Sequence, residues 1–395
     1  MVSVCFYFQV HQPHRLRRYH VFEIGNGCNY FDEEKNEAIC KKVSDKCYLP
    51  ANRLIYDLIH ESDGQFKVCY SITGAVLEQF ERFYPKVIES FIDLVDTGLV
   101  ELLDETYYHS LASLYSEEEF IQQVKMHRAK MKDLFGIKPR VFRNTELIYN
   151  NRLAQLAEKM GYDGVLAEGA DYILGWRSPN FIYRPSATEN IKLLLKNYRL
   201  SDDIAFRFSE RSWEGWPLTA DKFASWVSAV NGNGNVVNLF MDYETFGEHQ
   251  WEDTGIFEFL RHLPAEILKS GNDFKTPSEV ISSYEPMAEL DIHHIVSWAD
   301  VERDLSAWTG NRMQQTAIDQ LYKLEHDIKE RNDLALIEDW RKLQTGDHLY
   351  YMCTKWFNDG DVHKYFNAYD RPHDAFIAFM NVIADLKIRL REGAN

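Results

Sequence analysis

Residues 235–251 read NVVNLFMDYETFGEHQW, and this stretch decides the fold class. Its VVNLFM run is almost entirely apolar, which predicts a buried inner strand. Two carboxylates follow the run at once, Asp242 and Glu244. The stretch PRVFRNTEL at 139–147 repeats the arrangement and ends near Glu146. Acids at the ends of buried parallel strands are typical of an α/β barrel, whose active site lies at that edge of the sheet.

Strand-like runs recur along the chain, and helical patterns separate many of them. The seven predicted strands lie at 3–10, 66–73, 99–108, 139–144, 163–168, 191–201 and 235–243. Amphipathic helices, with apolar residues at i, i+3, i+4 and i+7, are predicted at 51–62, 84–98, 116–136, 151–161 and 219–234. Strands that alternate with helices indicate an α/β fold with a parallel sheet, either open and doubly wound or closed into a TIM-like barrel.

Two observations favour the barrel. Polar residues end nearly every predicted strand, and a barrel brings many strand ends to one site. No G-x-G-x-x-G follows the first strand, which weakens a dinucleotide-binding fold. After about residue 253 the patterns become helical. We therefore expect a catalytic barrel over residues 1–255 and a helical region over 256–395 that packs on the barrel and contributes to its cleft.

The composition argues against several classes of partner. The 395 residues carry a formal net charge of −17, which disfavours nucleic acid and anionic membranes but is compatible with a neutral sugar polymer. Aromatic residues make up 14%, enough to line a carbohydrate cleft, although an aromatic core explains most of them. The six cysteines form no C-x-x-C pair, and no signal-peptide pattern opens the chain, so we expect a reduced, cytoplasmic setting. No apolar run is long enough to cross a bilayer.

Five short motifs occur in a fixed order and carry a family resemblance. They are FQVHQPHR at 8–15, GAVLEQ at 74–79, NTEL at 144–147, MDYETFGEHQW at 241–251 and SWADVERDLSAWTGN at 297–311. Together they resemble the five sequence regions of glycoside hydrolase family 57. The resemblance implies an incomplete seven-stranded TIM-like barrel followed by helices, retention of anomeric configuration and no cofactor. It also implies one of the family's activities: α-amylase, α-glucan transferase, branching, debranching or α-galactosidase.

The resemblance also assigns two catalytic roles. The glutamate of the third motif, Glu146, maps to the nucleophile, and the aspartate of the fourth, Asp242, maps to the general acid/base. A nucleophile must be ionised, and Arg143 and Asn144 are neighbouring donors that favour ionisation. Glu244 lies on the same side of an extended strand as Asp242, where it can help to keep that acid protonated. Retention places the two carboxyls about 5–5.5 Å apart. The competing interpretation is a buried ion pair or two strand-end caps.

The same motifs indicate substrate-binding residues. The predicted set is His11, Glu78, His109, Glu244, His249, Trp251, Trp298, Asp300 and Trp308. Imidazoles and carboxylates can bind sugar hydroxyls, and tryptophan rings can stack on sugar faces. His109 and Glu78 can equally be helix-start residues. One predicted helix face of the fifth motif either meets substrate or forms a packing seam between barrel and helices; it carries Asp300, Asp304, Trp308 and Asn311.

We therefore predict a retaining α-glycosidase, similar to α-amylase, that acts on α-1,4-glucans or malto-oligosaccharides. An α-glucan transferase of the same family is one alternative. A metal-dependent polysaccharide deacetylase on a related barrel is another, with His11 as a metal ligand, but no H-x-x-x-H spacing supports a ligand cluster and no metal is expected. A non-catalytic glucan-binding homologue is the third, and the presence of both catalytic acids argues against it.

Overall fold

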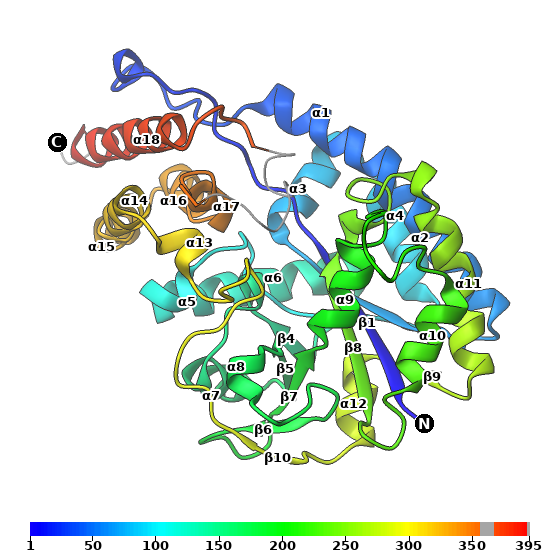
Figure 1. Cartoon of the computed structure of the whole chain (residues 1–395). Helices are drawn as coiled ribbons and strands as arrows, with labels where there is room; N and C mark the ends of the chain where they lie inside the picture. The colour runs from blue at the N-terminus through cyan, green and yellow to red at the C-terminus, as the bar shows by residue number, and fades with distance from the viewer. Residues whose placement is uncertain (356–366, 393–395) are drawn as a thin grey trace.

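The strands form two five-stranded sheets in a computed structural model that describes residues 1–355 and 367–392 (Figure 1). The first sheet has the order β3-β2-β1-β8, with β9 also paired to β1, and all its pairs are parallel. Its strands are β1 (Ser3–Val10), β2 (Val68–Ile72), β3 (Val100–Leu102), β8 (Val236–Asp242) and β9 (Asp273–Phe274). All eight residues of β1 are buried, as expected for a parallel strand that is covered on both faces.

The second sheet has the order β10-β6-β7-β5-β4 and contains one antiparallel pair, β6 with β7. Its strands are β4 (Val141–Arg143), β5 (Gly164–Glu168), β6 (Tyr183–Pro185), β7 (Lys192–Lys196) and β10 (Ala288–Leu290). A strand lies within each of the seven predicted ranges, but the one predicted at 99–108 is only β3 (Val100–Leu102), and the one predicted at 191–201 ends at Lys196. Asp202 and Asp203 then lie on a helix, because the Asn197 side chain accepts a hydrogen bond from the Leu200 amide and caps its start.

The two sheets meet along two seams. At the first, the backbone of Asp104 bonds to β4 on both sides, through the Val141 carbonyl at 3.0 Å and the Arg143 amide at 2.9 Å. At the second, the Asn197 amide donates to the Asn238 carbonyl on β8 at 2.9 Å. The pairing therefore gives an α/β fold of two sheets in contact, and it does not by itself give the single seven-stranded barrel that we expected.

Helices surround the sheets and continue to the end of the described chain (Figure 1). Their bounds are α1 (Glu33–Val43), α2 (Leu49–Glu61), α3 (Gly74–Phe83), α4 (Lys86–Asp96), α5 (Ala112–Tyr115), α6 (Glu117–Phe135), α7 (Asn151–Lys159), α8 (Asp171–Leu174), α9 (Tyr198–Ala205), α10 (Ala220–Ser228), α11 (Ile256–Lys269), α12 (Pro277–Ser283), α13 (Ser306–Thr309), α14 (Arg312–Tyr322), α15 (Glu325–Arg331), α16 (Leu334–Lys342), α17 (Gly346–Tyr350) and α18 (Pro372–Glu392). Within residues 1–355 and 367–392, no helix is both long and apolar enough to span a bilayer.

The chain after residue 255, where we expected a separate helical region, first returns to the sheets. Helix α11 buries Leu260, Leu263 and Ile267 in the same core as β1, β9 pairs with β1, and β10 pairs with β6. A second core then forms among the helices from α13 onward, around Trp308 and Trp340. Figure 1 shows these helices gathered on one side of the sheets.

Candidate active site

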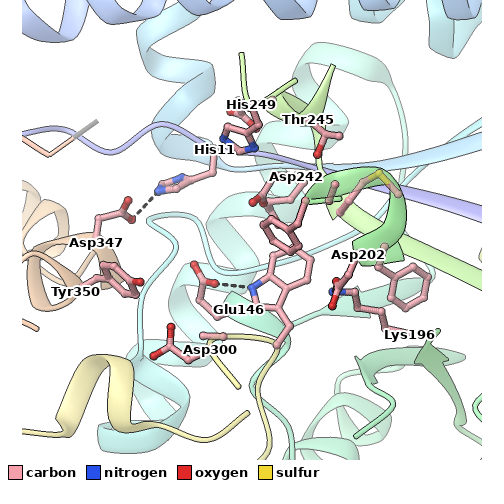
Figure 2. A pocket seen from close by; sticks show the side chains of 18 of the residues that line it. His11, Glu146, Lys196, Asp202, Asp242, Thr245, His249, Asp300, Asp347 and Tyr350 are labelled. Carbon is pink, nitrogen blue, oxygen red and sulfur yellow. Dashed lines mark hydrogen bonds and ion pairs between the residues drawn. The ribbon is translucent and has the colours of Figure 1, made fainter. Parts of the chain in front are cut away.

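A cavity of about 560 Å³ lies where strand ends of both sheets meet the C-terminal helices. Figure 2 shows Glu146 and Asp242 with their side chains directed into this space. Eight of the predicted site residues line it, and they are His11, His109, Glu146, Asp242, Glu244, His249, Trp298 and Asp300. The motifs that are far apart in sequence are therefore brought to one place.

Glu146 is held between two N–H donors. His109 Nε2 lies 2.9 Å from one carboxylate oxygen, and Trp298 Nε1 lies 2.6 Å from the other. The Trp298 amide also donates to the Glu146 carbonyl at 3.1 Å. Glu146 has a left-handed backbone with φ of 55°, which turns the chain sharply after β4. Two N–H groups that donate hydrogen bonds to the same carboxylate favour its ionised form.

Behind the cavity wall, His109 contacts a second carboxylate. Its Nδ1 lies 3.3 Å from Glu105, whose other oxygen accepts from Gln9 Nε2 at 3.2 Å. Burial disfavours the imidazolium, but the hydrogen bonds to Glu105 and Glu146 outweigh burial and raise the pKa of His109 to about 9. Burial also opposes the charge of Glu105, yet His109 and Arg143 together lower the pKa of Glu105 to about 2. The two groups form a buried ion pair.

The donors to Glu146 are not the ones that its sequence neighbours suggested. Arg143 is fully buried behind the cavity, 3.7 Å from Glu105, and its guanidinium lies over the Trp298 ring at 4.9 Å. The Asn144 amide donates to the Ile148 carbonyl at 2.9 Å. Adjacent strand residues point to opposite faces, so neighbours of a catalytic residue in sequence need not contact its side chain.

Asp242 ends β8, and Glu244 follows it within a 3-10 turn. Our expectation of an extended strand here is wrong, but the turn keeps the two carboxyls electrostatically coupled. Burial, with the charge of Asp242 as second cause, raises the pKa of Glu244 to about 8. One oxygen of Glu244 accepts from Tyr48 Oη and from Gln12 Nε2, the latter at 3.2 Å. Two coupled carboxyls therefore retain a proton near neutral pH.

His11 follows β1 and joins the site to the C-terminal helices. Its Nδ1 lies 2.9 Å from Thr73 Oγ1 and its Nε2 lies 3.0 Å from the Asp347 carboxylate on α17, as Figure 2 shows. The ring stacks on His109 with 4.1 Å between centroids. Burial and the neighbouring His109 charge lower the pKa of His11. A neutral His11 beside a charged His109 is the consistent assignment.

The Trp298 ring is flanked by cations. Besides Arg143, the ammonium of Lys196 lies 5.2 Å from its centroid, and Lys196 also pairs with Asp202 at 3.1 Å. Cations near an aromatic ring are attracted to its face. Since the indole also donates to Glu146, its contacts fix the position of the ring at the base of the cavity.

The predicted helix face of the fifth motif does not form. Asp300 and Arg303 have left-handed φ values of 54° and 51°, and α13 begins only at Ser306. The Asp304 carboxylate accepts from the Ser306 amide at 2.8 Å, so it serves the start of that short helix. Left-handed residues interrupt a right-handed helix, which is why the period-four spacing of this segment gave the wrong structure.

Three predicted substrate-binding residues lie away from the cavity lining. Glu78 on α3 accepts from Tyr107 Oη at 3.0 Å and lies 3.0 Å from His14 Nε2. Trp251 is 49% exposed, with Lys46 over its ring at 5.1 Å. Trp308 is 1% exposed and packs in the core of the C-terminal helices. The fifth motif was expected either to contact substrate or to pack between sheets and helices, and for Trp308 the second interpretation applies.

Several cavity residues were missed by the sequence analysis. They are Arg15, Lys196, Tyr198, Phe206, Asp347, Tyr350 and Tyr351, among others. Lys196 had a usable signal, because a charged residue ends the apolar LLLK run. Asp347 and Tyr350 had none, since a helical pattern does not tell which face meets a distant strand end. Among the described residues, the one His/Cys/Asp/Glu group with metal-ligand spacing is exposed on α15, at His326, Asp327 and Glu330.

Comparison with known proteins agrees with this architecture. The curated protein "Putative alpha-amylase" of Methanocaldococcus jannaschii is 47% identical over 403 residues, which cover 98% of this chain and 85% of that protein. The crystal structure of a branching enzyme from Pyrococcus horikoshii gives a TM-score of 0.67 at 16% identity, over 92% of this chain and 87% of that one. A 4-alpha-glucanotransferase from Thermococcus litoralis gives 0.60 at 17%, over 89% of this chain but only 51% of that one.

At these identities the two solved structures show a shared fold. The sequence pattern of glycosyl hydrolase family 57 matches residues 5–293, which span both sheets and both acids. With most of its length matched, and with a relative nearly half identical over almost all of it, the chain belongs to glycosyl hydrolase family 57 and is a glycoside hydrolase.

Proposed function

We propose that this protein is a retaining α-glycosidase that cleaves α-1,4-glucans or malto-oligosaccharides, with Glu146 as nucleophile and Asp242 as general acid/base. The observation that carries the proposal is the Glu146 carboxylate, held between His109 and Trp298 in a cavity that Asp242 also lines. A nucleophile at rest must be ionised, and this environment favours that state. The name of the 47% identical relative supports an α-glucan as substrate.

The first chemical step forms a glycosyl–enzyme ester. A Glu146 oxygen attacks the anomeric carbon, the bond from that carbon to the glycosidic oxygen breaks, and Asp242 gives its proton to the leaving oxygen. In the second step Asp242 takes a proton from water, whose oxygen attacks the same carbon and releases Glu146. Two inversions give net retention. If a sugar hydroxyl replaces water, the product is a transferred chain.

The carboxyl pair of Asp242 and Glu244 supports an acid at this place in the cavity, because burial and the charge of Asp242 raise the pKa of Glu244, so that the pair holds one proton near neutral pH. The two seams between the sheets support a related inference on architecture. We infer that β1, β2, β3, β4, β5, β7 and β8 make an incomplete seven-stranded barrel, since backbone hydrogen bonds join the chain just after β3 to β4 and the chain just after β7 to β8. We assign the same barrel, with the C-terminal helices that supply Asp347, as the catalytic unit.

The test measures turnover of maltoheptaose and follows the anomeric configuration of the first product by proton NMR. Glu146→Gln is expected to reduce turnover by more than about 1,000-fold, and Asp242→Asn by about 100- to 10,000-fold. Glu289→Gln, an exposed carboxylate on β10, is the matched control and should keep wild-type turnover. The first product should retain the α configuration.

Each outcome has a defined meaning. Wild-type turnover in Glu146→Gln, or a β product, would refute the assignment. Longer oligosaccharides among the products would identify transfer as the main reaction of the same two acids. Binding of maltoheptaose without any cleavage or transfer would instead identify a non-catalytic glucan-binding protein.

A further inference from the structure

We propose that Glu105, which lies behind the cavity wall, is a positioning residue that keeps His109 protonated and directed at Glu146, so that the nucleophile is held as a carboxylate, and that Arg143 in turn keeps Glu105 ionised. This inference rests on the proposed role of Glu146. Neither Glu105 nor Arg143 lines the cavity, and both side chains are fully buried. The contribution of Glu105 therefore passes through His109, whereas Arg143 acts on Glu105 and also contacts the Trp298 ring.

The geometry forms a chain of alternating charge. The guanidinium of Arg143 lies 3.7 Å from the Glu105 carboxylate, Glu105 lies 3.3 Å from His109 Nδ1, and His109 Nε2 lies 2.9 Å from Glu146. When both ring nitrogens of a histidine face ionised carboxylates at these distances, both nitrogens donate, which requires the imidazolium. The two carboxylates bracket the ring, so it cannot turn away without losing one ion pair.

Arg143, the charged group in this series that lies farthest from Glu146, has an unusual environment. All three guanidinium nitrogens of Arg143 are buried and make no hydrogen bond among the described residues, although Glu105 lies within ion-pair distance. A buried cation without hydrogen bonds costs free energy, so its presence needs a reason. Beside Glu105, its positive charge keeps that carboxylate ionised, in agreement with the lowered pKa of Glu105. An ionised Glu105 is what the protonated His109 requires.

Several titratable and charged groups surround His109. The nearest are Glu105, Glu146, Arg143, His11 and Asp347. His11 stacks on His109 and has a lowered pKa, so it does not supply the positive charge. Arg143 lowers the pKa of His109 by repulsion, but the two carboxylates dominate and the net direction is upward. Glu105 is the carboxylate outside the cavity on which this direction depends.

The experiment follows the His109 ring directly, by NMR titration of protein labelled with nitrogen-15 histidine, with His109→Gln used to assign its signals. The wild-type ring is expected to stay doubly protonated through neutral pH, with its midpoint at about 9. In Glu105→Gln the midpoint should fall by about 1–3 pH units, because one bracketing charge is lost. Glu105→Asp, which keeps the charge, should restore part of that shift.

The kinetic readout is the pH profile of maltoheptaose turnover. In Glu105→Gln, His109 should lose its proton at about pH 6–8 instead of about 9, so the support that its charge gives Glu146 should be lost over that lower range. The decline of kcat/KM should therefore begin at lower pH than in the wild type, while KM changes little. Glu119→Gln is the matched control, since Glu119 is equally buried and ion-paired to Arg341 at 2.8 Å. Glu119→Gln should lower the stability of the protein but leave the His109 titration and the pH profile of turnover unchanged.

Two results would overturn the inference. One is a wild-type His109 midpoint below 7, a measurement that needs no variant to fold. The other is an unchanged midpoint in folded Glu105→Gln. If Glu146→Gln proves active, the proposed function fails on its own, while the titration of His109 in the resting enzyme still decides whether the charge chain exists.

Discussion

Replacement of Trp298 by phenylalanine separates the two contributions of this side chain. The phenylalanine ring keeps an aromatic surface for Arg143 and Lys196, which lie 4.9 Å and 5.2 Å from the indole centroid. It removes the Nε1 proton that is donated to Glu146 at 2.6 Å. His109 remains as a donor, so the charged form of Glu146, the proposed nucleophile, is destabilised but keeps the His109 hydrogen bond.

The expected size follows from the strength of such a bond. A hydrogen bond to a charged group contributes about 1.5–3 kcal/mol. Since about 1.4 kcal/mol corresponds to one pH unit, loss of this donor should move the acid limb of kcat/KM upward by about 1–2 units. The sign is fixed, because the indole stabilises the carboxylate and not its protonated form. At pH values below the acid limb, kcat/KM of Trp298→Phe should be roughly 10- to 100-fold lower than that of the wild-type enzyme.

The assay is the pH dependence of kcat/KM on maltoheptaose. Trp340→Phe is the matched control, because Trp340 is also buried and donates its Nε1 proton, to the Leu321 carbonyl at 2.9 Å, but lies in the core of the C-terminal helices. Both variants should lose thermal stability, and only Trp298→Phe should shift the limb. A folded Trp298→Phe enzyme with the wild-type limb would refute the view that this donor sets the charge of Glu146.

Two further changes test the neighbouring structure. Glu244 has its pKa raised to about 8, so the folded protein binds a proton more tightly than the unfolded chain, and stability should decline as pH rises from about 4.5 to about 8. Glu244→Gln should flatten that decline in Tm; an unchanged slope would contradict the raised pKa. A Cβ at Gly74 would overlap the Tyr107 ring, which lies two residues before His109, so Gly74→Ala should lower both Tm and turnover. Gly27→Ala, which meets open space, is its control, and equal behaviour of the two variants would show that the Tyr107 loop can yield.

The parts of the fold that could be predicted are those that local pattern specifies. The runs at β1 and β8 are apolar throughout and bounded by polar residues, which indicates buried strands without further information. Strand 191–201 was predicted too long because the apolar residues of α9 continue the pattern past Asn197. The segment around Asp300 was predicted as a helix because spacing is visible in a sequence and left-handed backbone is not.

The environment of Glu146 could not be predicted, for a different reason. Its donors come from 37 residues before it and 152 residues after it. No local periodicity encodes such contacts. Sequence neighbours were the natural candidates, but Arg143 instead supports Glu105 from behind. The family motifs located the carboxylates, whereas the groups that set their charge had to be seen in three dimensions.

The C-terminal helices help to line and support the candidate active site. The loop that carries His109 is held from that side: the Gly346 amide donates to the His109 carbonyl at 2.9 Å, and Ser110 forms a bridge with Thr345. His109 itself has a left-handed φ of 52°, a conformation that costs free energy and persists only where surrounding contacts enforce it. Because those contacts come from the start of α17, which also supplies Asp347 to His11, the geometry around Glu146 depends on the sheets and the helices together. The residues that hold Glu146 and His109 in place therefore come from both sides of the boundary that we predicted at residue 255.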